Sequence, residues 1–218
     1  MRIISLVTQK GGSGKSTLAS SLAVAAHEGG ERVFVIDMDP QQSLVNWAKT
    51  RGRDDVPVGA VTAARLSATL AALQKNGFTL AIIDTAGAEG GSSSAAMKAA
   101  DLNIIPSRPN IFDLWASEQT RTTLKALKSE FVFVLNQCPP AQQTARVEEG
   151  AAALEAMGGL ITPLVQARVD YQEAARHGMG VTEINPHGAA AGEIKALWSS
   201  IKRRLARGKG KATVRKAA

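Results

Sequence analysis

Gln9-Lys10-Gly11-Gly12-Ser13-Gly14-Lys15-Ser16-Thr17 is the stretch that decides the fold of this 218-residue chain. An apolar run at residues 3–7 precedes it and an alanine-rich segment of helical period at 16–27 follows it, so it joins a predicted strand to a predicted helix. Glycines in such a loop let backbone N–H groups close around phosphate oxygens, and the helix N-terminus adds partial positive charge. The stretch therefore predicts a nucleotide-binding P-loop, in preference to a glycine-rich turn without a ligand.

The side chains of this loop have separate predicted tasks. Lys15 reaches the outer phosphates, the Ser16 hydroxyl ligates Mg²⁺, and Thr17 serves the α-phosphate. We therefore expect ATP and Mg²⁺ as cofactors. The predicted nucleotide contacts in the loop are Gly11, Gly12, Ser13, Gly14, Lys15, Ser16 and Thr17.

Short β-branched runs alternate with segments of helical period along most of the chain. Strands are predicted at 3–7, 32–36, 80–83, 102–105 and 131–135, with a weaker run at 160–164 and an extra edge strand at 56–61. Helices are predicted at 16–27, 43–49, 63–75, 92–99, 114–128, 142–156 and 192–206. Such alternation predicts a single α/β P-loop domain, residues 1–207, with a mostly parallel β-sheet flanked by helices on both faces. Residues 208–218 are expected to form a basic, disordered tail.

Carboxylates follow two of the predicted strands. Asp37 and Asp39 come after 32–36, and Asp84 comes after 80–83. Because parallel strands end at one edge of a sheet, we expect these carboxylates to face the loop, where one holds Mg²⁺ and another orients the water that attacks the γ-phosphate. Asp37 and Asp84, with Ser16, are the predicted metal residues. The alternative is that an aspartate here caps the next helix or turn, above all Asp37.

Composition and charge limit where the chain works and what it binds. The single cysteine, Cys138, forms no intramolecular disulfide, and no apolar stretch has membrane-spanning length, so we expect a cytoplasmic protein. Residues 1–193 carry 17 Lys/Arg against 19 Asp/Glu, whereas residues 194–218 carry 9 Lys/Arg and no acid. A basic C-terminal segment of this kind suits a polyanion, with a solvated solubility tail as the alternative.

The loop has a second, early lysine, Lys10, and in this it resembles the deviant Walker A motif of ParA/MinD-type ATPases. The resemblance is greatest to the small ParA-type partition ATPases. It continues through Asp37-Met38-Asp39-Pro40-Gln41, Ile83-Asp84-Thr85, and Ile105-Pro106-Ser107-Arg108-Pro109 with Asp113.

This resemblance implies roles for individual residues in an ATP-bound homodimer. Lys10 reaches the partner's phosphates, Asp39 positions the attacking water, and Asp84 supports Mg²⁺. Lys10, Lys15 and Asp39 are thus the predicted catalytic residues. Asn136 matches the base-contacting position and joins the predicted nucleotide contacts.

Two features depart from the pattern of that family. Asp84-Thr85-Ala86-Gly87 stands where ParA proteins often have Asp-Thr-Pro-Pro, which leaves the switch behaviour near Asp84 open. The chain begins directly on its first strand, as in small partition ATPases without a helix-turn-helix domain, so sequence-specific operator binding is not expected.

Three functions share this loop: a DNA-surface positioning ATPase, a membrane-surface ATPase similar to MinD, and an ATP-dependent ligase similar to dethiobiotin synthetase. The helix predicted at 192–206 has an apolar stripe, but almost nothing after Leu205 could insert into a membrane. We therefore favour nonspecific double-stranded DNA and expect no stable membrane association. The predicted DNA contacts are Lys202, Arg203, Arg204 and Arg207.

The resulting hypothesis is an ATPase of plasmid or chromosome partition that is nucleoid-associated in the cytoplasm. A partner that resembles ParB-type centromere-binding proteins, or another cargo adaptor, would stimulate hydrolysis and release the dimer from DNA. Trp47, Trp115 and Tyr171 are expected to be packing residues rather than members of a site.

Overall fold

Six parallel strands form one sheet in the part of the chain that the computed structural model describes, residues 1–87, 90–139 and 145–216. Their order across the sheet is β3-β2-β4-β1-β5-β6, and every pairing is parallel. This confirms the predicted parallel α/β sheet. The strands are β1 (Arg2–Leu6), β2 (Val33–Asp37), β3 (Val58–Ala60), β4 (Leu80–Asp84), β5 (Leu102–Ser107) and β6 (Phe131–Leu135).

Strand prediction succeeds at the sheet edge formed by β3 and fails at residues 160–164. β3 is short and pairs only with β2 among the described strands, as an edge strand does. The predicted run at 160–164 forms no strand and contributes one isolated bridge, between Phe133 and Leu160. Gly158 and Gly159 have positive φ just before it, and Pro163 lacks the N–H that a ladder needs.

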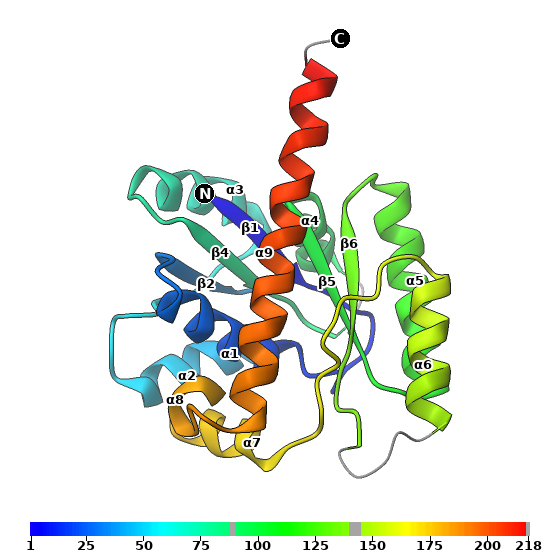
Figure 1. The fold of residues 1–218 in the computed structure, drawn as a ribbon. Coiled ribbons are helices and arrows are strands. Elements are labelled where there is room, and N and C mark those ends of the chain that lie inside the picture. Colours follow the sequence, from blue (N-terminus) through cyan, green and yellow to red (C-terminus); the bar gives the residue numbers. More distant parts are fainter. Residues whose placement is uncertain (88–89, 140–144, 217–218) are drawn as a thin grey trace.

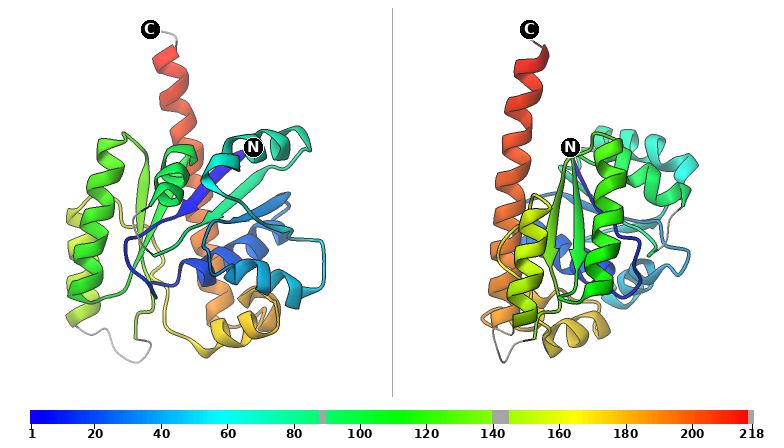
Figure 2. Two further views of the ribbon diagram at one scale, coloured as in Figure 1. Left: turned by 180° about the vertical axis from the view of Figure 1, so that it is seen from behind. Right: turned by 90° about the vertical axis from the view of Figure 1, so that its right-hand side faces the viewer.

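Helices cover both faces of the sheet (Figures 1 and 2). One face packs on α1 (Lys15–Glu28), α2 (Ser43–Arg51), α7 (Val169–Arg176), α8 (Val181–Ile184) and α9 (Ala189–Lys216). The other face packs on α3 (Ala63–Lys75), α4 (Gly91–Ala99), α5 (Ile111–Ala126) and α6 (Ala145–Ala156). The strands are apolar on both sides because neither face meets water. Residues 142–144 of the helix predicted at 142–156 lie outside the described part.

The final helix is longer than its sequence predicts. The expected end was residue 206, yet α9 continues to Lys216 and projects beyond the sheet in Figure 1. The glycines at 208 and 210 do not end it, because most residues around them are Ala, Lys and Arg, which have high helix propensity. The structure describes the backbone of 208–216 as the end of this helix, and the disorder expected for the tail 208–218 stays a prediction.

The apolar stripe of α9 packs on the domain. Its members are almost fully removed from solvent, and α9 lies across α1. No helix within the described residues is long and apolar enough to cross a membrane. The stripe consists of Ile194, Leu197, Trp198, Ile201 and Leu205.

The sheet register places the predicted site residues side by side. Asp84, the last residue of β4, pairs in register with Leu6 of β1 on one side and with Asp37 of β2 on the other. The loop between β1 and α1 therefore begins next to both carboxylates. The carboxyl ends of these strands form the edge at which ligands bind in open α/β sheets.

Candidate nucleotide site

The loop between β1 and α1 has the backbone of a phosphate cradle. Gly12 and Gly14 have φ of 75° and 89°, a conformation that favours glycine, and Gly14 is the N-cap of α1. A Cβ on Gly14 would also collide with the side chain of Asn136. The first N–H groups of α1 point out of the helix at this end, where an anion is stabilised by the helix dipole.

Lys15 lies inside this cradle. The residue is 7% exposed, and its Nζ donates to the carbonyl oxygen of Lys10 at 3.2 Å. Burial lowers the pKa of its ammonium group, while the nearby carboxylates of Asp84 and Asp39 oppose that shift. A largely desolvated ammonium group beside the N-terminus of a helix is suited to bind phosphate oxygens, as the sequence predicts.

Ser16 and Asp84 form the part of the site that fits a magnesium ion. Ser16 Oγ donates to Asp84 Oδ2 at 2.6 Å, and Asp84 is fully buried. Among the described residues, Asp84 Oδ1 has no hydrogen-bond partner. Burial, aided by the charge of Asp37, raises the pKa of Asp84 to about 7 against the lowering effect of the Ser16 hydrogen bond. Mg²⁺ prefers oxygen ligands and keeps several of its bound waters. The serine hydroxyl and the buried carboxylate oxygen without a partner could therefore bind the ion directly or through one of these waters.

No group of three or more His, Cys, Asp or Glu residues suited to a metal occurs in the described part of the chain. The donor set here is instead one hydroxyl and one carboxylate, as expected for an ion that takes its other ligands from nucleotide phosphates and water. The residues present therefore fit Mg²⁺ bound together with a nucleotide.

Asp37 has the capping contacts that were the alternative for it. Its Oδ2 accepts from the backbone N–H groups of Leu44 and Val45 at 3.0 and 3.2 Å, and its Oδ1 accepts from that of Asp39 at 3.1 Å. The carboxylate thus fixes the first turn of α2. Its role as a metal residue stays a prediction, because both of its oxygens already accept hydrogen bonds from the backbone.

Asp39 lies in a tight turn after β2, half-buried beside the loop. Its Oδ1 accepts from the backbone N–H of Gln41 at 2.9 Å, and its charge acts on Lys15. The carboxylate is therefore held by its own turn and lies near the lysine that faces the phosphates. This placement is compatible with the predicted role of positioning the attacking water.

Gly87 gives a physical reason for the departure that follows Asp84. A Cβ built on Gly87 would lie 2.7 Å from the backbone nitrogen of Gly11. The segment after β4 therefore contacts the phosphate loop backbone directly, and only a residue without a side chain permits that approach. Residues 88 and 89 lie outside the described part.

Lys10 lies at the rim of the site and contacts its own chain. Its side chain is 34% exposed, and its Nζ is 4.0 Å from Asp113 Oδ2 and 5.4 Å from the centroid of the Phe112 ring. Asp113 is buried and also accepts two hydrogen bonds from Arg108, at 2.9 and 3.1 Å. The predicted reach of Lys10 to a second subunit would require it to leave these two contacts.

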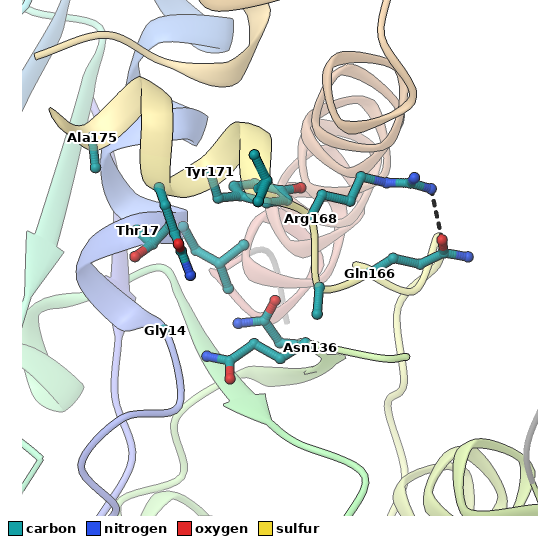
Figure 3. Close-up of a pocket in the computed structure, with 12 residues that line it drawn as sticks. Gly14, Thr17, Asn136, Gln166, Arg168, Tyr171 and Ala175 are labelled. Carbon is teal, nitrogen blue, oxygen red and sulfur yellow. Dashed lines mark hydrogen bonds between the residues drawn. The ribbon is translucent and has the colours of Figure 1, made fainter. Parts of the chain in front are cut away.

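A cavity of about 490 Å³ opens beside the loop (Figure 3). Gly14, Thr17 and Leu18 form one wall, and the residues after β6 form another. Asn136 Nδ2 donates to the carbonyl oxygen of Ser13 at 2.8 Å, which joins β6 to the loop. The remaining wall is formed by Gln166, Ala167, Arg168, Val169, Tyr171, Gln172 and Ala175.

This cavity has the place and size for the nucleoside of a bound nucleotide. It borders Gly14 and Thr17 of the phosphate loop, and its lining combines apolar surface with the polar side chains of several residues. Tyr171 Oη is buried and has no hydrogen-bond partner among the described residues. Arg168 is fixed by Glu193 of α9 at 2.6 Å and by Gln166 at 2.6 Å, the second of which is drawn in Figure 3.

The sequence pattern does not predict the cavity wall that contains Arg168 and Tyr171. Tyr171 was expected to pack, and it is buried, but it also lines the cavity. The helix that carries it, α7, has only eight residues and was not predicted. A weak signal existed: Asp170 in the first turn and the apolar spacing of Tyr171 and Ala174 are typical of a short amphipathic helix.

The predicted DNA contacts lie far from this cavity. Arg2, at the amino end of β1, donates to the carbonyl oxygen of Leu205, so this part of α9 lies near the edge of the sheet opposite the loop. Lys202 pairs with Glu31 at 3.4 Å and Arg204 with Glu130 at 3.0 Å. Both side chains, and those of Arg203 and Arg207, remain exposed.

The phosphate loop after β1, the carboxylates at the ends of β2 and β4, and the adjoining cavity are the features of a P-loop nucleotide-binding protein with a parallel sheet. A family model for the CobQ/CobB/MinD/ParA nucleotide-binding domain matches residues 4–181. The chain belongs to this ParA/MinD family.

Individual relatives cover nearly the whole chain. The maintenance of carboxysome distribution protein A of Gloeobacter kilaueensis is 31% identical over 194 residues, covering 84% of each chain. Its namesake in Halothiobacillus neapolitanus is 26% identical over 208 residues, covering 91% of this chain and 95% of that protein. The structure of apo McdA from Cyanothece superposes with a TM-score of 0.79 at 17% identity, covering 94% of this chain and 99% of that one. The chain therefore spans most of the length of each of these proteins, and the apo McdA structure has the same fold.

Proposed function

We propose that this protein is an ATP-dependent, dimerising switch that positions a cargo along nonspecific double-stranded DNA. The observation that carries the proposal is a phosphate site with two lysines, Lys15 buried within it and Lys10 at its rim. In the ParA/MinD-type ATPases that this loop resembles, the early lysine reaches the phosphates of a partner subunit, and we infer the same role for Lys10 in this chain. Relatives named for carboxysome distribution favour cargo positioning in general, with DNA partition as one form of it.

The residues of the site support hydrolysis of ATP to ADP and phosphate. Lys15 and the loop N–H groups offset the charge of the phosphates, and Ser16 and Asp84 hold Mg²⁺. Bound Mg²⁺ supplies further charge neutralisation at the β- and γ-phosphates. Asp39 accepts a hydrogen bond from the water whose oxygen bonds to the γ-phosphorus as the bond to the β,γ-bridging oxygen breaks.

The nucleoside cavity supports a purine nucleotide as the ligand. Asn136 uses its Nδ2 on Ser13 and so presents its Oδ1 as an acceptor, which suits the exocyclic amino group of adenine. Guanine has a carbonyl oxygen, an acceptor, at the ring position where adenine has this amino group, so the Asn136 Oδ1 favours ATP over GTP. Homodimerisation in the ATP state and a stimulating adaptor of the ParB type complete the cycle.

The basic segment of α9, residues 202–207, favours DNA as the surface to which the switch binds. Arg203 and Arg207 have no acidic partner among the described residues, so they are the better placed of the predicted contacts. The apolar stripe that a membrane-bound relative would insert is instead buried beneath α9. We therefore favour the nucleoid over a membrane as the place where this cytoplasmic protein acts.

The proposal is tested by DNA retention of the purified protein with ATP, ADP or no nucleotide, at about 50 and 200 mM salt. We expect retention at low salt only with ATP, and its loss at the higher salt. Lys15→Ala should bind neither nucleotide nor DNA and is the matched control. Equal retention in all three nucleotide states would contradict the ATP-dependent switch. No retention at low salt would contradict DNA as the surface that the protein binds.

A further inference from the structure

Large apolar side chains gather on one exposed ridge next to the phosphate loop. Within the described part of the chain, Ile111, Phe112 and Trp115 are 52%, 61% and 59% exposed. They occupy the first turns of α5 and form what we call the aromatic patch. Trp115 was expected to pack in the core, and the structure shows the opposite. Clustered exposed aromatic residues are typical of protein–protein contact sites.

The aromatic patch is held in place by a well-bonded scaffold. Asn110 caps α5 by accepting from the backbone N–H of Asp113 at 3.0 Å, and Arg108 holds the Asp113 carboxylate with two hydrogen bonds. The Phe112 and Trp115 rings contact each other edge to face, with centroids 5.6 Å apart. The patch is therefore a preorganised surface, which reduces the entropy lost when a partner binds.

The phosphate loop and the aromatic patch share one residue. Lys10 lies over the Phe112 ring and near Asp113, while its carbonyl oxygen accepts from Lys15. Gly12 of the same loop lies close to Arg108, whose Nη1 is 3.8 Å from the position of a Cβ there. A protein that covers the aromatic patch would therefore also contact the rim of the phosphate loop.

We propose that the aromatic patch is the contact by which a second copy of this chain docks, and that Lys10 governs access to it. Lys10 lies on Phe112 in the nucleotide-free chain. When it extends to the phosphates of the second copy, it uncovers this ring, and the partner then covers it. The inference rests on the proposed function, in which Lys10 acts across a dimer.

Symmetry favours a second copy over another occupant. In a two-fold dimer both subunits contribute the same surface, so an apolar patch that lies near the axis is complementary to its own copy once Lys10 has left Phe112. Lys10 and the patch are adjacent, so one approach satisfies both the phosphates and the apolar surface. An adaptor protein would need the patch but would have no reason to need Lys10.

Trp115 is a built-in reporter for this contact. Trp47 and Trp198 are each 6% exposed, so a soluble quencher such as acrylamide acts mainly on Trp115. Fluorescence quenching and light scattering are measured together with Mg²⁺ and a non-hydrolysable ATP analogue, with Mg-ADP, and without nucleotide. We expect the analogue alone to raise the mass to that of a dimer and to reduce the quenching of Trp115.

Substitutions separate the patch from the nucleotide site. Phe112→Ala and Trp115→Ala should each weaken the analogue-dependent dimer by about tenfold or more, with unchanged binding of a fluorescent nucleotide to the monomer. Thr122→Ala, on the same exposed face of α5 but two turns further along, should leave the dimer unchanged.

The outcomes distinguish this inference from the proposed function. If the wild-type protein dimerises while Trp115 stays fully quenchable and both alanine variants dimerise normally, the patch assignment is overturned and the switch stands. If the variants dimerise normally but lose stimulation by a cargo adaptor, the occupant is the adaptor and the assignment is again wrong. If the wild-type protein binds the analogue yet remains monomeric, the dimeric switch itself fails, and the inference fails with it.

Discussion

At the scale of single residues, the site depends on a few charges that the fold holds away from water. Lys15 and Asp84 are both buried, and their pKa values shift in the directions that favour the neutral forms. Neither charge is fully compensated within the chain, as the unpaired Oδ1 of Asp84 shows for the described residues. A nucleotide with Mg²⁺ would compensate both at once.

The burial of Asp84 predicts that the stability of the nucleotide-free protein depends on pH. Because burial raises the pKa of Asp84 to about 7, the folded state holds one proton more than the unfolded state between the ordinary aspartate pKa and pH 7. The free energy of unfolding should therefore fall as pH rises through this range, by at most about 1.4 kcal/mol per pH unit from this group. Asp84→Asn should flatten the profile in urea unfolding at pH 4.5 to 7.5. An unchanged slope in that variant would contradict the assignment.

Asp39 is predicted to act in hydrolysis and not in binding. Asp39→Ala should bind ATP normally, lower turnover by about 100-fold, and persist as an ATP-bound dimer on DNA. Phosphate release and DNA retention check the two halves of this expectation. Asp54→Ala, which removes an exposed aspartate beyond the end of α2, is the matched control. Normal turnover of the Asp39 variant would exclude its role with the attacking water.

At the scale of elements, α2 connects the carboxylate turn to the wall of the nucleoside cavity. Its first turn is fixed by Asp37, and its last residue, Arg51, is buried and bonded to Asp55 and Glu183. Arg51 also donates to the carbonyl oxygen of Gly178, just after α7. Trp47 adds a hydrogen bond from its indole N–H to the carbonyl oxygen of Met179 at 3.1 Å. The helix that follows the Asp39 turn is thus tied to the helix that lines the cavity.

Breaking this connection should destabilise the protein by an amount typical of a buried ion pair. Arg51→Met leaves Asp55 and Glu183 without their shared partner and should lower the free energy of unfolding by ~3 kcal/mol. Since Arg51 lowers the pKa of Asp55 to about 2, the stabilisation is complete above the ordinary aspartate pKa and lost as pH falls towards 2. The variant should lose that acid dependence in urea unfolding. Arg53→Met, which removes an exposed partner of Glu183, should cost much less.

At the scale of the whole molecule, nucleotide and DNA are assigned to opposite ends of the sheet. The phosphate loop lies at the carboxyl ends of the strands, and the basic part of α9 lies near the amino end of β1. The helix α9 spans this distance, because Glu193 near its start holds Arg168 of the cavity wall. A dimer formed at the loop would leave both basic surfaces free, so it would double the phosphate contacts with DNA.

Charge reversal on α9 should weaken DNA binding without affecting the nucleotide site. Arg203→Glu with Arg207→Glu should lower the slope of log affinity against log salt by about 2 per chain, because roughly 0.9 counterion is released per phosphate contact. Lys125→Glu, on the opposite face of the sheet, is the control. Titrations of a short duplex at several salt concentrations measure the slope. An unchanged slope in the double variant would place the DNA surface elsewhere.

The local features of this chain follow from its sequence alone. The loop from Gly11 to Thr17, five of the strands, and the carboxylates after β2 and β4 are encoded in contiguous residues whose periodicity and glycine positions specify backbone conformation directly. The parallel sheet follows from the same alternation. The order of predicted elements therefore fixed where the phosphate site lies.

Only the tertiary structure decided how separate segments meet. It placed Tyr171 and Arg168 against the loop, turned the Trp115 side chain towards solvent, and paired two of the predicted DNA contacts with acidic residues far away in the chain. It also showed that Asp37 makes the capping contacts with the following helix that the sequence offered as an alternative. These properties depend on which helix or loop packs against each face of an element. Sequence periodicity shows that a face is buried, but it carries no information about which element covers it.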